Sequence, residues 1–103
     1  MRLLIMFDLP TGSKEERKSY SAFRKFLIDD GYQMEQFSVY SRVLLSRESL
    51  NTHLERLNAS LPAAGSVFVL ELTEKQYENR RILVKKHVDK QTANLGAQMT
   101  LAF

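Results

Sequence analysis

The feature that most constrains the fold is an unbroken apolar run over residues 3–7, Leu-Leu-Ile-Met-Phe, which ends at Asp8. Apolar residues that follow one another without alternation predict a strand covered on both faces, near the centre of a sheet. Pro10 and Gly12 then break the run. The run is too short to cross a membrane and lacks the cleavage pattern of a signal peptide. We therefore expect a cytoplasmic protein with no membrane partner.

A helix is predicted to begin at Ser13, because Ser13 and Glu16 have the spacing of a capping box. It should run to about Asp30, where Gly31 suits a C-terminal cap. At about 100° per residue, one arc of this helix is apolar and faces the core, and the opposite arc is basic. The apolar arc holds Tyr20, Phe23, Phe26 and Leu27, and the basic arc holds Lys14, Arg17, Lys18, Arg24 and Lys25.

Residues 32–45 are rich in aromatic and β-branched side chains and are long enough for two consecutive strands. The turn between these strands is expected at Ser38 or Ser41. A second helix should begin at Ser46, because the leucines at 50, 54, 57 and 61 form one apolar stripe. Residues 66–72 predict another buried strand.

This order of elements predicts an α+β, ferredoxin-like βαββαβ fold. The right-handed crossover rule puts both helices on one face of an antiparallel sheet. The other face then needs a cover, and a chain of 103 residues gains stability from dimerisation, so we expect a homodimer through the sheet face.

The last thirty residues lie outside this unit. Thr73 and Glu74 predict a short helical turn, and residues 81–84 predict an added edge strand, which gives a domain over residues 1–84. Residues 85–103 are predicted to be a flexible connection followed by an apolar strand that pairs with another chain. The partner-binding side chains of that strand are Met99, Leu101 and Phe103.

Several kinds of active site are excluded by composition. The chain has no cysteine, which rules out a disulfide scaffold, a thiolate metal site and a cysteine nucleophile. It also lacks a G-x-S-x-G nucleophile elbow and a glycine-rich phosphate loop. His53 and His87 lack the spacing of a metal site, and we interpret both as surface residues.

Asp8 is the main candidate for chemistry, because a carboxylate that ends a buried strand often marks a site there. The alternative is that its side chain caps the turn between Pro10 and Ser13. A magnesium site usually needs one or two carboxylates with water or substrate phosphates, and Asp8 supplies one. A second copy of the chain would supply another.

The basic arc of the first predicted helix is the main candidate for binding phosphate. The net charge of +3 means little unless the cations cluster, and on this arc they do. A solvated surface is the alternative for every such cluster. A second cluster and one further residue complete the nucleic-acid-binding candidates: Arg80, Arg81, Lys85 and Lys86, with Arg42.

Four separated blocks of the sequence carry a family likeness. They are M-R-L-L-I-M-F-D-L-P, the helix E-E-R-K-x-Y-x-x-F-R-K-F-L, the segment Q-F-S-V-Y-S and the later T-E-K-Q-Y. Together, over residues 1–84, they resemble the small CRISPR-associated adaptation protein. That protein is the ferredoxin-like partner of the spacer integrase, is often called the CRISPR-associated endoribonuclease, and here looks like its type II branch.

The resemblance implies a homodimer with Asp8 of each subunit near the twofold axis, as ligand of Mg²⁺ or Mn²⁺ and as catalytic residue of a nuclease. It also implies a subunit of the spacer-acquisition complex, which bridges two integrase dimers and holds duplex DNA with single-stranded ends on its basic surface. RNA is the other substrate implied. A third reading, from the fold alone, is a dimer that binds a small ligand or another protein.

One position departs from the family pattern. Many members have tyrosine before the strand-end aspartate, and this chain has Phe7. If a phenol hydroxyl positions water or substrate there, the departure argues against nuclease activity and leaves the scaffold role untouched.

Overall fold

The structure, a computed structural model, describes residues 1–85. Its elements follow the predicted order. They are β1 (Arg2–Asp8), α1 (Lys14–Asp29), β2 (Gln33–Gln36), β3 (Val39–Val43), α2 (Arg47–Ala59), β4 (Ser66–Leu72) and the short α3 (Glu74–Glu78). No helix in residues 1–85 is long and apolar enough to span a membrane.

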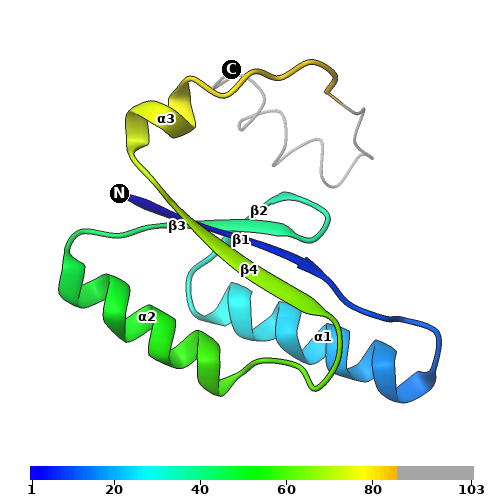
Figure 1. Cartoon of the computed structure of the whole chain (residues 1–103). Coiled ribbons are helices and arrows are strands. Elements are labelled where there is room, and N and C mark those ends of the chain that lie inside the picture. Colours follow the sequence, from blue (N-terminus) through cyan, green and yellow to red (C-terminus); the bar gives the residue numbers. More distant parts are fainter. Residues whose placement is uncertain (86–103) are drawn as a thin grey trace.

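The four strands form one antiparallel sheet in the order β2-β3-β1-β4, so β1 is internal as its apolar run predicts. Figure 1 shows α1 and α2 on one side of this sheet and α3 on the other. The ferredoxin-like arrangement is confirmed. The core lies between the sheet and the two long helices, where Leu3, Ile5, Phe23, Leu27 and Leu50 are buried.

Both ends of α1 are fixed by local hydrogen bonds. The side chain of Ser13 accepts from the N–H of Glu16, and the carboxylate of Glu16 accepts from the N–H of Ser13, so the predicted capping box is present. At the other end Gly31 adopts a φ of 91°, and the N–H groups of Gly31 and Tyr32 donate to carbonyls of the last turn. This is a Schellman motif, which favours glycine at that position.

The β2–β3 turn lies at Phe37 and Ser38, where Ser38 has a φ of 65°. Of the two positions expected for this turn, the structure has Ser38, while Ser41 lies buried in β3. Glu35 lies at the β-bulge-like irregularity where the β2–β3 register shifts between Met34 and Gln36. Such an irregularity changes the direction in which a side chain points.

The predicted edge strand at residues 81–84 is wrong for the described chain. Residues 81–85 are exposed and form no strand. The physical reason is that α3 carries the chain over one face of the sheet rather than along an edge, and a strand without a neighbour has no hydrogen-bonding partner (Figure 1).

Candidate functional site

Asp8 is the last residue of β1 and lies opposite Ser66 in β4. Its side chain is exposed and belongs to the face of the sheet away from α1 and α2, which we call the open face. The neighbouring Gly65 has a φ of 100°, and a Cβ there would lie 2.7 Å from the carbonyl oxygen of Asp8. The strand end is thus held by close backbone packing that requires glycine.

Phe7 points the opposite way, into the core beneath the sheet. Its ring stacks on Tyr40 at 5.7 Å between centroids and meets Phe23 edge-on at 5.2 Å. A hydroxyl at residue 7 would therefore lie on the other side of the sheet from the Asp8 of the same subunit. Within one subunit, the replacement of tyrosine by Phe7 therefore does not argue against nuclease activity at Asp8.

The open face is apolar beside Asp8. Successive pairs on β1 and β4 place Met6 opposite Phe68 and Leu4 opposite Leu70. Phe68 is 53% exposed and Leu70 is 44% exposed, whereas Leu3, Ile5 and Phe7, on the helix side of β1, are buried. A sheet face of this kind is typical of an interaction surface.

A metal site built from one copy of the chain is not supported. Within residues 1–85 no group of three or more His, Asp or Glu side chains is placed to hold an ion. Asp8 offers one exposed carboxylate, which fits Mg²⁺ only if a second copy or a substrate phosphate adds further oxygens.

The basic arc of α1 is exposed along the outer side of the helix, as predicted. Lys25 pairs with Asp29 at 2.7 Å, and Arg17 donates to the carbonyls of Thr11 and Gly12. This arc and Asp8 lie on opposite sides of the sheet, so the structure does not bring them onto one surface (Figure 1).

Arg42 is placed differently from the other basic candidates. It is half-buried, and its guanidinium donates to the carbonyl of Asp30 at the end of α1. It also covers Gly31, where a Cβ would collide with it. Arg42 therefore stabilises the α1 C-terminus from β3.

The second basic cluster follows α3 on the open-face side. Arg81 and Lys85 are exposed, and Arg80 is half-buried against Tyr77. Lys86, Met99, Leu101 and Phe103 lie outside the described residues, as does His87.

A polar network between α3 and the sheet was not predicted. Glu35 accepts hydrogen bonds from Ser41 at 2.5 Å and from the Tyr77 hydroxyl at 2.8 Å. Burial alone would raise the pKa of Glu35, but hydrogen bonds from three neighbouring side chains and the nearby Arg80 charge hold it below its ordinary value. Burial and the bond to Glu35 raise the pKa of Tyr77. The sequence feature that could have indicated this network is Arg2, a charged residue at the start of an otherwise apolar strand.

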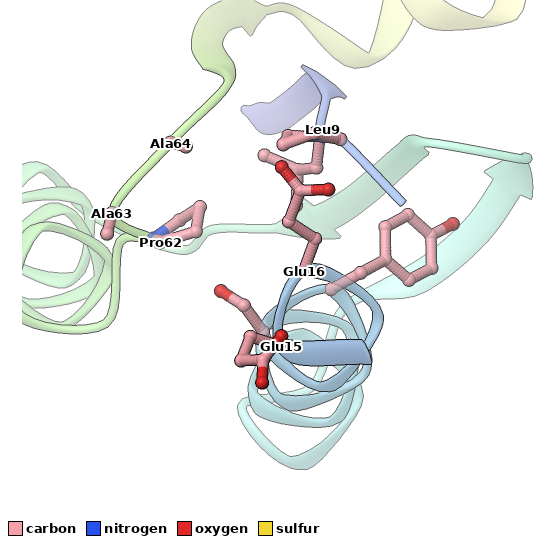
Figure 2. Close-up of a pocket in the computed structure, with 9 residues that line it drawn as sticks. Leu9, Glu15, Glu16, Pro62, Ala63 and Ala64 are labelled. Atoms are coloured by element: carbon pink, nitrogen blue, oxygen red, sulfur yellow. The ribbon is translucent and has the colours of Figure 1, made fainter. Parts of the chain in front are cut away.

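A shallow hollow of about 170 Å³ lies between the start of α1 and the loop after α2. Figure 2 shows Leu9 and Pro62 on its walls, with the carboxylates of Glu15 and Glu16 beside them. Glu16 is already engaged in the capping box. None of the side chains predicted for chemistry lines this hollow.

The chain resembles known proteins over most of its length. The family model described as CRISPR associated protein Cas2 matches residues 1–93. Two proteins named CRISPR-associated endoribonuclease Cas2 are close relatives. The one from Acidovorax ebreus is 51% identical over 82% of this chain and 82% of its own length. The one from Streptococcus mutans serotype c (strain UA159) is 41% identical over 96% of this chain and 90% of its own length.

The crystal structure of Streptococcus pyogenes Cas2 at pH 6.5 has a similar fold. The TM-score is 0.63, with 21% identity over 82% of this chain and all of that one. At this identity the similarity concerns the fold alone.

Proposed function

The chain belongs to the Cas2 family of CRISPR-associated proteins, and on that premise we propose that it is a dimeric, DNA-binding subunit of the complex that acquires spacers. In this role it bridges two integrase dimers and holds a prespacer duplex against its basic surface. The protein contributes position and charge, and the integrase contributes the strand-joining chemistry.

The observation that carries this proposal is the row of exposed cations on the outer side of α1. Lys14, Arg17 and Lys18 lie in the first two turns, and Arg24 follows two turns later. Cations spaced along one helix face match a backbone of regularly spaced phosphates, and they bind it without reading sequence. Lys25 contributes less, because Asp29 partly neutralises it.

The apolar open face supports the dimer. Two copies that met through Phe68 and Leu70 would remove these exposed side chains from water, and burial of apolar surface is worth about 25 cal/mol per Å². The same arrangement would bring Asp8 of each copy toward the interface, since Asp8 lies on that face.

The test is spacer integration reconstituted with the partner integrase. The variant K14E/R17E/K18E should lose both integration and DNA binding, because repulsion replaces phosphate contact. The matched control K14R/R17K/K18R keeps every charge and should retain both activities. In the wild type, DNA affinity should fall steeply between about 50 and 200 mM salt. A flat salt response would contradict phosphate binding.

A second candidate function is a metal-dependent nuclease, favoured by Asp8 at the strand end and by the name of the relatives, CRISPR-associated endoribonuclease Cas2. When bound, Mg²⁺ or Mn²⁺ would polarise a phosphodiester and activate water. Asp8 from two copies would hold the ion, and Gly65 would keep each carboxylate in place.

Cleavage of single-stranded RNA and duplex DNA separates the two functions. Asp8→Ala should abolish cleavage and spare integration if the nuclease is a side activity. Equal cleavage by Asp8→Ala and wild type would assign the activity to a contaminant. Loss of integration in a folded Asp8→Ala protein would make the carboxylate essential and reverse the order of the two proposals.

A further inference from the structure

The ring of Tyr77 lies between two guanidinium groups. The central carbon of Arg2 is 3.8 Å from the ring centroid, and that of Arg80 is 3.9 Å from it. Guanidinium planes stack well on aromatic faces, and each such contact is favourable. Tyr77 therefore joins the first strand of the sheet to the segment that leaves α3.

The sheet fixes the ring in this position. The hydroxyl of Tyr77 donates to Glu35, whose two oxygens lie 2.8 and 2.9 Å away. Arg2 is held independently, since its Nε and Nη2 donate to Glu74 and its Nη1 donates to Ser41. Its side chain is only 10% exposed. The face of the ring that contacts Arg2 is thus anchored to rigid structure.

The other face of the ring orients Arg80. Besides the stacking contact, Nη1 of Arg80 donates to the carbonyl of Tyr77 at 2.9 Å. The N–H of Arg80 also donates to that carbonyl, at 3.2 Å. Arg81 follows directly, Lys85 comes four residues after Arg81, and both are exposed. The orientation of Tyr77 therefore determines where this basic segment begins.

We propose that Tyr77 is a positioning residue for phosphate binding by the second basic cluster. It holds Arg80 in a fixed orientation and places Arg81 on the open-face side, so that both cations reach phosphate, and without the ring they lose these contacts. This inference rests on the proposed binding of duplex DNA and adds a second phosphate-contacting region to the basic arc of α1.

The test measures the affinity for duplex DNA at a series of salt concentrations. The slope of log affinity against log salt concentration counts phosphate contacts and does not respond to the global stability of the protein. Tyr77→Leu removes the aromatic face without changing the net charge, and it should reduce the slope by about 1–2. Tyr77→Phe keeps the ring and should retain a slope near that of the wild type. Phe37→Leu, the same type of change at an exposed turn, is the matched control.

Arg80→Lys provides a variant with little risk to folding. It keeps the positive charge but cannot stack a planar guanidinium on the Tyr77 ring, so it should reduce the salt slope as Tyr77→Leu does. A wild-type slope in both Tyr77→Leu and Arg80→Lys would overturn the positioning role while DNA binding stands. If the wild-type protein shows no salt-dependent binding, the proposed function itself fails. If R80A/R81A also leaves the slope unchanged, this segment does not contact phosphate and the inference is wrong.

Discussion

Asp30 and His53 share a hydrogen bond inside the protein, with 2.8 Å between Oδ2 of Asp30 and Nδ1 of His53. Their side chains are 10% and 7% exposed, so the prediction of a surface histidine was wrong. The pair connects the C-terminal cap of α1 to the middle of α2, and Arg56 approaches the other Asp30 oxygen at 2.9 Å. Burial and the nearby Asp30 charge raise the pKa of Tyr32, which packs edge-on against His53, to about 12.

Removal of the carboxylate should destabilise the fold. In Asp30→Ala the buried imidazole loses its hydrogen-bond partner, and we expect the free energy of unfolding to fall by about 2–3 kcal/mol. Asp29→Ala is the matched control, because its pair with Lys25 is exposed and should be worth about 0.5 kcal/mol or less. Urea unfolding measures the free energy of unfolding of both variants. Equal losses in Asp30→Ala and Asp29→Ala would show that the buried contact stabilises the fold no more than the exposed pair does.

The sequence could predict what depends on neighbours along the chain. The capping box at Ser13 and the glycine cap at Gly31 involve residues within one or two turns, and both predictions are confirmed. His53 could not be placed, because its partner lies 23 residues away and only the packing of α2 against α1 brings them together. The contact between Glu35 and Tyr77 spans 42 residues and depends on where α3 folds over the sheet.

The same distinction applies to the candidate site. The position of Asp8 at the end of a central strand followed from the apolar run before it. No pattern along the chain indicates that Arg42 holds the end of α1, since that role needs β3 beside the helix terminus. Which basic residues share a surface is a property of the fold, and α1 and α3 lie on opposite sides of the sheet (Figure 1).

Gly65→Ala should disturb Asp8 through the backbone. The added Cβ would lie 2.7 Å from the Asp8 carbonyl oxygen, at a φ of 100° that side chains rarely adopt. We expect a loss of about 2 kcal/mol or more in the free energy of unfolding, with altered chemical shifts at Asp8. In Gly12→Ala the added Cβ would lie 3.3 Å from Oε1 of Glu16, a distance that a small shift of that side chain relieves, and stability should change by about 0.5 kcal/mol at most. The expectation fails if both variants behave alike.

Stability should depend on the ionisation of Glu35. Its pKa is lower in the folded protein than its ordinary value of 4.5. The folded state therefore gains stability from this carboxylate above about pH 4.5, and loses it as the pH falls through the lowered value. Glu35→Gln should cost about 1–2 kcal/mol at pH 7, and the difference from wild type should shrink below pH 4.5.

Denaturant unfolding from pH 7 to pH 3 tests the role of Glu35. Tyr77→Phe removes one of the donors to the carboxylate and should show part of the same effect. A difference between wild type and Glu35→Gln that stays constant with pH would exclude ionisation of Glu35 as its cause.

Phe68→Glu should convert the proposed dimer to a monomer with an intact fold. Phe68 is 53% exposed on the open face of one copy, so the substitution leaves the core of that copy unchanged but places charge in the proposed interface. Phe37→Glu is the control, since Phe37 is 83% exposed on the β2–β3 turn. Sedimentation velocity should show a monomer for the first variant and a dimer for the second. A dimer in both would place the interface elsewhere.

The proposed dimer should also depend on divalent metal through Asp8. If Asp8 of each copy approaches the twofold axis, two carboxylates repel each other there, and a bound Mg²⁺ offsets the repulsion. Chelation should then weaken the wild-type dimer by roughly tenfold or more, equivalent to about 1.4 kcal/mol. In Asp8→Asn the repulsion is absent, so dimer affinity should be the same with Mg²⁺ and with chelator. Dimer dissociation measured by dilution in both buffers decides this. Equal metal dependence in wild type and Asp8→Asn would mean that any ion at the interface is held by other groups, and would separate Asp8 from metal binding altogether.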